Sequence, residues 1–361
     1  MIQPATRGSF DWALLAAMAA LIGLGLLMLY SSTAFENREP FHKQVFWAMI
    51  SALVLLVATW VPYHVWGSLS VPIYAGCLLL LGLVLVIGPE IRNTRSWLRV
   101  GGVSFQPAEV AKVATLLLLA VFLSEKNELA LRLRTVVVMV LIVALPVGLI
   151  LLQPDLGSAL VFFPLLAVMV FLAGLRWRVI VLLVVAGLLS VPLLWPQLKP
   201  YQQERVLTFF RPERDPQGTG WQVMQSRIAV GSGGFTGKGI GSGSQAQLEF
   251  LPDRHTDFIF SVLAEETGFV GASIALTLYG VLLYSCVQTA RAARDRLGLF
   301  LAMGVATLLG AQIIINIGVI LGLMPTAGIP LPLMSYGGSS LVSTVAALGL
   351  VLNVRMRCLV N

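Results

Sequence analysis

The sequence has few charged residues, cysteines and histidines, and each shortage excludes a class of protein. Charged residues make up 11% of the 361 and hydrophobic residues 57%, whereas about a quarter of residues are charged in soluble domains. Cys77, Cys286 and Cys358 are far apart, in or beside apolar stretches, so they predict neither a disulfide framework nor a zinc site. With 3 histidines, a histidine cluster is not expected. The composition predicts a chain that lies in a bilayer.

Long apolar stretches are abundant, and several reach the roughly 20 residues that a helix needs to cross about 30 Å of hydrocarbon. The first, from Trp12, lacks an obvious small-residue cleavage site, so we interpret it as a retained helix and not as a signal peptide. The sequence therefore predicts an all-α polytopic membrane protein, with residues 1–361 forming a single membrane domain. Hydropathy predicts about ten spanning helices, at about 12–32, 43–62, 71–88, 107–124, 135–152, 157–174, 177–195, 262–287, 298–323 and 338–354.

The distribution of Lys and Arg predicts the orientation. An even number of helices puts both termini on one side, and a cytoplasmic N-terminus places most basic residues of the short loops inside, as the positive-inside tendency requires. The long loop at about 196–261, between the seventh and eighth helices, is then extracytoplasmic. The formal charge of +7 follows from this topology and does not indicate nucleic-acid binding. The inside residues are Arg7, Lys126, Arg132, Arg134, Arg176, Arg178, Arg291, Arg294, Arg296, Arg355 and Arg357.

The long loop and one later segment have their own organisation. In the loop, "WQVMQSRIAV" predicts a short amphipathic helix, and "GSGGFTGKGIGSGS" is either a flexible connector or a phosphate-binding nest around Lys238. Residues 324–340, "MPTAGIPLPLMSYGGSS", are rich in Pro and Gly at membrane depth. Non-helical backbone survives there only if it is buried in protein or lines a wet cavity. We expect a cavity open to the exterior.

Two acidic positions in predicted helices each allow two interpretations. Glu109 and Lys112 are three residues apart and so share one helix face. Ionisable groups in spanning segments are costly, so the pair either stabilises packing or presents the lysine to an anionic substrate group. Asp155 follows a proline at a predicted helix start, where it is either an N-cap or a site residue.

The stretch "LPDRHTDFIFSVLAEETG" at 251–268 gathers the most ionisable groups. Asp257 stands where the long loop meets a spanning helix, so it is a candidate general base that can reach both water and a lipid-borne substrate, or else an N-cap. Glu265 and Glu266 are adjacent and point about 100° apart on a helix, so at least one of them is structural. His255 is expected to form a structural hydrogen bond rather than to bind a metal.

Five separated motifs resemble the SEDS (shape, elongation, division and sporulation) family, more closely its rod-shape branch than its division branch. They are "NTRSWLRVGGVSFQPAEVAKV", "LLQPDLGSALVFF", "RVLTFFRPERDPQGTGWQVMQSRIAVGSGGFTGKG", "LEFLPDRHTDFIFSVLAEETG" and "MPTAGIPLPLMSYGGSS". The sequence departs from the family pattern at Ala108, where Ser is frequent, and at Asp253, where Glu is frequent. Neither departure changes the expected function.

The resemblance implies a peptidoglycan glycosyltransferase that polymerises lipid II during cell elongation, on the outer face of the bacterial cytoplasmic membrane. The implied partners are lipid II, the lipid-linked glycan, a class B penicillin-binding protein and other membrane proteins of the elongation complex, with no nucleic acid. Asp257 matches the family's essential aspartate, and Glu109, Lys112 and Asp155 match its other polar cavity residues.

From this activity we expect Asp257 to deprotonate the acceptor hydroxyl while cations neutralise the departing pyrophosphate. The candidate cations are Lys112, Arg205, Arg211 and Lys238. Mg²⁺ or Mn²⁺ held partly by substrate phosphates would share this task, although the sequence contains no dedicated metal cage. The serines between Ser335 and Ser340 either contact sugars or serve close helix packing.

Two other functions fit the residues alone. A lipid II flippase or another transporter would also carry intramembrane charges, but it needs polar groups along the full depth of a path. A non-catalytic scaffold would only position and activate a penicillin-binding protein. A neutral isostere at Asp257 would leave the pathway of such a scaffold intact.

Overall fold

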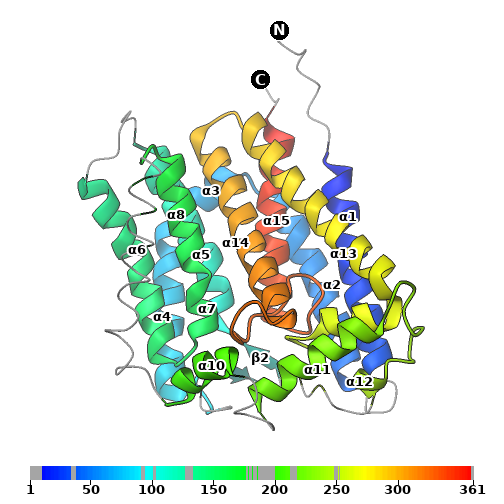
Figure 1. The fold of residues 1–361 in the computed structure, drawn as a ribbon. Coiled ribbons are helices and arrows are strands. Elements are labelled where there is room, and N and C mark those ends of the chain that lie inside the picture. The colour runs from blue at the N-terminus through cyan, green and yellow to red at the C-terminus, as the bar shows by residue number, and fades with distance from the viewer. Residues whose placement is uncertain are drawn as a thin grey trace.

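The computed structural model shows a bundle of long helices with one short hairpin (Figure 1). Within the described part of the chain, 8 helices are long and apolar enough to cross a membrane, which confirms an all-α polytopic membrane protein. They are α1 (Trp12–Ser32), α2 (Glu39–Trp60), α4 (Ser70–Ile87), α5 (Pro107–Ser124), α6 (Leu133–Leu152), α13 (Ile259–Ala292), α14 (Arg296–Ile320) and α15 (Gly338–Arg357). The structure describes residues 10–33, 38–90, 94–100, 103–126, 133–175, 178, 181, 185, 200–211, 218–247, 251 and 253–358.

Two predicted spans differ from the structure, and a third is not tested by it. The span at 157–174 is divided into α7 (Leu156–Leu160) and α8 (Phe162–Leu172). The eighth span, predicted at 262–287, becomes the longer α13, because two helical segments continue across a kink at Gly268, whose φ is 67°. The span at 177–195 lies almost entirely outside the described residues.

The two ends of the bundle are different. The start of α1 and the end of α15 lie at one end, as an even number of crossings requires (Figure 1). The other end carries the short elements β1 (Leu98–Val100), β2 (Val103–Phe105), α10 (Pro200–Phe210), α11 (Thr219–Ser232) and α12 (Ser244–Gln247). The helix predicted in "WQVMQSRIAV" is confirmed as α11. Which end faces the cytoplasm stays a prediction.

Packing distinguishes a central group of helices from a peripheral one. Helices α5, α14 and α15 are mostly buried, and they pack on one another. Helix α2 packs mainly on α15 and leaves Phe46, Met49 and Leu53 exposed, as expected for side chains that face lipid. The short α3 (Tyr63–Ser68) links α2 to α4.

Candidate active site

A cavity of about 810 Å³ is lined in part by the β1–β2 hairpin, which lies at the end of the bundle opposite the termini (Figure 1). Its wall is built by the hairpin, the first turns of α2, the junction between α6 and α7, residues 253–258, the second half of α14 and residues 326–340. The expectation that the Pro- and Gly-rich segment at 324–340 lines a cavity is therefore confirmed. Segments that are distant in the sequence therefore line the same cavity.

Asp257 lies on this wall, and its backbone is fixed from two sides. Asn316 of α14 donates its Nδ2 hydrogen atoms to the carbonyl oxygen of Asp257 at 2.9 Å and to that of Ile329 at 2.8 Å. The Ser335 hydroxyl donates to the carbonyl oxygen of Thr256 at 2.6 Å. The aspartate is thus held at a defined place against α14 and the irregular segment.

The N-cap interpretation of Asp257 is wrong. Helix α13 begins at Ile259, its N-cap residue is Phe258, and no side chain caps it. Gly328, whose φ is +67°, lies beside the carboxylate, and a Cβ at Gly328 would be 3.8 Å from Asp257 Oδ2. Asp257 therefore lines a cavity and is not the N-cap residue of α13.

Asp155 lines the same cavity and also caps α7. Its Oδ1 accepts from the Ser158 amide at 3.0 Å, and its Oδ2 accepts from the Ser158 hydroxyl at 2.8 Å and from Gln106 Nε2 at 3.0 Å. Burial raises the pKa of Asp155, while the two hydrogen bonds from Ser158 and the nearby Lys112 charge oppose that rise. Both interpretations from the sequence fit: Asp155 is an N-cap, and it is positioned to contact a ligand.

The two aspartates flank one piece of backbone. Gly157, two residues after Asp155, approaches the Ala327 carbonyl so closely that a Cβ at Gly157 would lie 1.8 Å from that oxygen. Gly328 follows directly and lies beside Asp257. The short contact at Gly157 therefore sets the spacing between the Asp155 wall and the Asp257 wall.

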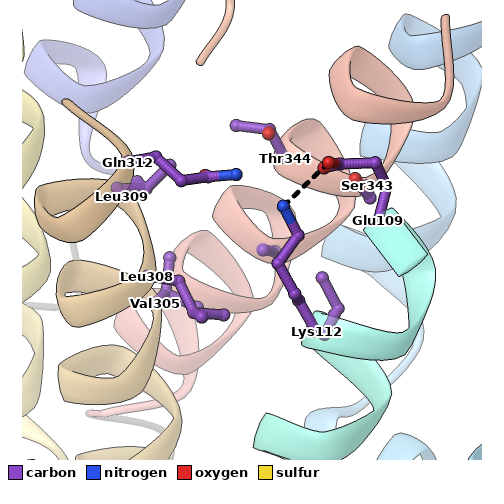
Figure 2. Close-up of a pocket in the computed structure, with 10 residues that line it drawn as sticks. Glu109, Lys112, Val305, Leu308, Leu309, Gln312, Ser343 and Thr344 are labelled. Atoms are coloured by element: carbon purple, nitrogen blue, oxygen red, sulfur yellow. Dashed lines mark hydrogen bonds and ion pairs between the residues drawn. The ribbon is translucent and has the colours of Figure 1, made fainter. Parts of the chain in front are cut away.

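Glu109 and Lys112 form an ion pair with each other (Figure 2). Lys112 Nζ lies 2.8 Å from Glu109 Oε1, and both side chains are almost fully buried. They line a separate chamber of about 20 Å³ together with Gln312, Ser343 and Thr344, which is about the space of one water molecule. Neither residue lines the large cavity.

Lys238 and the two adjacent glutamates hold the glycine-rich segment in place. Lys238 Nζ lies 2.6 Å from the fully buried Glu265 Oε1, which also accepts from the Ser244 hydroxyl. Glu266 accepts from the Ser31 hydroxyl of α1 at 2.6 Å. The amides of Lys238 and Gly239 donate to carbonyl oxygens of α13. The flexible-connector interpretation is therefore wrong, and both glutamates are structural.

Of the remaining predicted site residues, two serines line the cavity and the others do not or lie outside the described side chains. Arg211 is exposed after α10 and does not line the cavity. Arg205 belongs to α10, but its side chain lies outside the described part of the structure. His255 Nδ1 forms a hydrogen bond with the Ser32 hydroxyl at 3.1 Å, as expected for a structural histidine. Ser339 and Ser340 line the cavity, and Ser339 accepts from the Gln106 amide.

Several cavity residues were not predicted as site residues. Lys43 and Trp47 come from α2, Trp97 and Arg99 from the hairpin region, and Asn316 from α14. Trp97 and Arg99 lie in "NTRSWLRVGG", a motif that supported the family resemblance, and this was the available signal. Among the described residues no group of 3 or more His, Cys, Asp or Glu side chains could hold a metal ion.

Comparisons with known proteins agree with this architecture. A family model described as "FTSW_RODA_SPOVE: Cell cycle protein" matches residues 12–358. The "Probable peptidoglycan glycosyltransferase FtsW" of Trichlorobacter lovleyi is 35% identical, covering 98% of this chain and 94% of that protein. The "Peptidoglycan glycosyltransferase MrdB" of Escherichia coli K12 is 36% identical, covering 95% and 93%. Relatives with division and rod-shape names are thus about equally similar, and the predicted branch stays a prediction.

Two solved structures share the fold. One, described as "Structural coordination of polymerization and crosslinking by a peptidoglycan synthase complex", has a TM-score of 0.83 and 41% identity, covering 96% of this chain and 98% of that chain. The crystal structure of the Thermus thermophilus rod shape determining protein RodA has a TM-score of 0.73 and 35% identity, covering 96% and 97%. Both likenesses extend over nearly the whole chain.

Proposed function

The chain belongs to the FtsW/RodA/SpoVE (SEDS) family and is a multi-pass membrane peptidoglycan glycosyltransferase, and we propose that the cavity around Asp257 is its active site. The observation that carries this proposal is the position of Asp257. It lies on the wall of a cavity of about 810 Å³, with its backbone fixed by Asn316, one residue before the N-cap residue of α13. A carboxylate held in this way can accept a proton from a bound hydroxyl group.

The proposed substrate is lipid II, and the reaction is one in-line displacement. The 4-hydroxyl oxygen of the acceptor GlcNAc bonds to C1 of the lipid-linked donor glycan, and its proton passes to Asp257. The bond between C1 and the pyrophosphate oxygen breaks, and undecaprenyl pyrophosphate leaves with the electron pair. The α donor bond becomes a β product bond, so the configuration inverts. The leaving group needs charge neutralisation more than it needs a proton.

Asp155 and its partners are proposed to contact the sugars. The Asp155 carboxylate, the Gln106 amide group and Ser339 lie on the same cavity wall and supply acceptors and donors for hydroxyl groups. Mg²⁺ and Mn²⁺ usually bind through one or two carboxylates together with substrate phosphates. Asp155 or Asp257 could supply such a carboxylate, so the wall fits a cation that arrives with the substrate and not one in a protein cage.

The cations predicted for the pyrophosphate fit that role less well. Lys112 and Lys238 each form an ion pair with a buried glutamate, Glu109 and Glu265, and neither lysine lines the cavity. Removing either lysine would leave a buried charge without its partner, which is costly. We therefore assign Lys112 and Lys238 to stabilising the fold around the site. Arg211 does not line the cavity either, and Arg205 stays a candidate because its side chain lies outside the described part of the structure.

The cellular setting is also part of the proposal. The last turns of α13 and α15 carry Arg291, Arg355 and Arg357. Both helices finish at the end of the bundle that carries the termini (Figure 1), and positive residues favour the cytoplasmic side. The cavity would then face the exterior of the bacterial cytoplasmic membrane, where lipid II is used. One solved relative belongs to a peptidoglycan synthase complex that coordinates polymerisation and crosslinking, which supports a class B penicillin-binding protein as the crosslinking partner.

The test is a polymerisation assay with purified full-length protein in lipid nanodiscs. Lipid II and Mg²⁺ or Mn²⁺ are supplied, with and without a class B penicillin-binding protein, and wild type is compared with Asp257→Asn. We expect glycan polymer from wild type only, at equal folding and equal partner binding. Polymer from both proteins would exclude Asp257 from the chemistry. Transport of lipid II without polymer would indicate a flippase, and activation of the partner alone would indicate a scaffold.

A further inference from the structure

Two cationic side chains that the sequence did not single out reach the cavity. Among the described residues, Lys43 and Arg99 are the lysine and arginine that line it. Lys43 lies in the first turns of α2, where its Nζ is 2.5 Å from Glu39 Oε1, and both side chains stay about half exposed. Arg99 is exposed and lies in β1, opposite Ser104 of β2, which lines the same cavity.

The two cations form a pair of like charge. Lys43 and Arg99 line one cavity, although they come from elements separated by more than fifty residues of sequence. Glu39 neutralises part of this charge from the exposed side of Lys43. Like charges held at one cavity wall raise the local concentration of an anion and favour its binding.

The start of α15 adds to the positive potential at the same wall. Gly338, Ser339 and Ser340 form its first turn and line the cavity, and no side chain caps this helix at Gly337. Amide groups in the first turn of a helix lack partners within the helix and carry a partial positive charge. Trp47, one turn after Lys43, packs so closely on Gly338 that a Cβ there would lie 2.1 Å from the indole ring. This contact fixes α2 against the start of α15.

We infer that Lys43 and Arg99, with the first turn of α15, bind the pyrophosphate of the lipid-linked donor glycan and stabilise it as the leaving group. This inference rests on the proposed function and specifies where its anion lies. In this assignment different residues perform the two tasks that the displacement requires. Asp257 accepts the proton, and Lys43, Arg99 and the start of α15 stabilise the negative charge that develops on the pyrophosphate. It also explains why Lys112 and Lys238 can be engaged elsewhere.

The first experiment measures binding without turnover. Full-length protein carrying Asp257→Asn is placed in nanodiscs, and its affinities for undecaprenyl pyrophosphate, undecaprenyl monophosphate and undecaprenol are measured with and without Lys43→Gln and Arg99→Gln. We expect each substitution to weaken pyrophosphate binding about 10-fold and to leave undecaprenol binding unchanged. Arg95→Gln is the matched control, because Arg95 is exposed, pairs with Glu90 and does not line the cavity.

Unchanged pyrophosphate binding in the Lys43→Gln, Arg99→Gln double variant would overturn the inference. An equal loss with Arg95→Gln would also overturn it, because the effect would then be one of net charge. Binding is measured independently of polymerisation, so the two proposals can fail separately. If wild type binds undecaprenyl pyrophosphate through these residues and makes no polymer from lipid II, the proposed function fails and the anion site stands.

The second experiment identifies which pyrophosphate occupies the site, since donor and acceptor both carry one. Protein with an intact Asp257 is given a short lipid-linked glycan as donor and lipid II as acceptor, and each concentration is varied separately. We expect Arg99→Gln and Lys43→Gln to lower kcat and to raise KM for the glycan, with KM for lipid II unchanged. A rise confined to KM for lipid II would assign the site to the acceptor and contradict our inference.

Discussion

The large cavity around Asp257 and the small chamber around Glu109 and Lys112 both contain charged side chains within a bundle of apolar helices, yet they differ in what surrounds the charge. The cavity has about 810 Å³ of space, and Asp257 lines its wall. The chamber has about 20 Å³, and its two charges lie 2.8 Å apart with almost no exposure (Figure 2). An ionisable residue at membrane depth is a site hypothesis by default. This comparison shows that the space around a charged side chain and its burial separate a candidate site residue from a structural one.

The largest expected effect comes from neutralising the Asp257 carboxylate, and it tests whether the large cavity is the active site. Asp257→Asn removes the proton acceptor while keeping the shape, so kcat should fall by about 10²- to 10⁴-fold with no change in Tm. Glu90→Gln, which removes an exposed carboxylate, is the control and should keep wild-type activity. The measurement is glycan polymerisation with purified protein. A variant with more than a tenth of the wild-type kcat would place the chemistry elsewhere.

Substitutions in the small chamber should lower the stability of the fold, in contrast to Asp257→Asn, which should lower only the activity. Glu109→Gln or Lys112→Met alone leaves a buried charge without its partner, which costs about 3–5 kcal/mol of stability. Tm should fall clearly in either single variant, and the double variant should recover most of the loss because neither charge is then left alone. Thermal unfolding in detergent measures this. Single variants that keep Tm and lose polymerisation would show that the chamber belongs to the active site.

The backbone between the two aspartates offers a smaller and more local test. A methyl group in Gly157→Ala overlaps the Ala327 carbonyl oxygen, so the Ala327–Gly328 segment must move beside Asp257. We expect a loss of about 1–3 kcal/mol in stability and roughly a 10-fold lower kcat. Gly148→Ala in α6 is the control, because nothing lies within 4 Å of its added Cβ. Equal kinetics in the two variants would show that this contact does not position Asp257.

Two substitutions of Asp155 separate its role as the N-cap of α7 from its role in the cavity, and they have the smallest expected effects on stability. Asp155→Asn keeps a side-chain oxygen for the Ser158 amide, so the cap survives. Because burial raises the pKa of Asp155 above its ordinary value of 3.8, the folded state holds the proton more tightly than the unfolded state. Ionisation of Asp155 therefore lowers the free energy of unfolding once the pH rises above that value.

Asp155→Asn should thus have an unchanged or higher Tm at neutral pH, and this difference should disappear in acid. Asp155→Ala, which removes the cap, should lose about 0.5–2 kcal/mol. The variants are compared by thermal unfolding across pH and by polymerisation. If Asp155→Asn polymerises lipid II like wild type, Asp155 is only a cap.

The sequence predicted most helices because hydropathy reports burial in lipid directly. The starts of α1 and α15 agree with the predicted spans. Hydropathy carries no information about backbone dihedrals, so it missed the division between α7 and α8 and the kink at Gly268. The hairpin was also missed, although two valines flanking a Gly-Gly pair, Val100 and Val103, are a hairpin signal.

The candidate site could be predicted only in part, for a similar reason. Asp257 stands at a boundary between loop and helix that the sequence itself reveals, and the same reasoning located residues 324–340 at a cavity. The partners of Lys238 could not be predicted, because Glu265 lies twenty-seven residues away and only the folded chain brings them together. Lys43 and Arg99 meet for the same tertiary reason.

The most direct test of the central claim, that Asp257 acts as the base, is the pH dependence of kcat/KM for glycan polymerisation at several Mg²⁺ concentrations. A base that accepts one proton predicts a single acidic limb, in which the rate rises about tenfold per pH unit before a plateau, and the limb keeps its position as Mg²⁺ increases. If the limb moves to lower pH as Mg²⁺ rises, protons and metal compete for the carboxylate. Asp257 would then be a cation ligand, which would contradict the account.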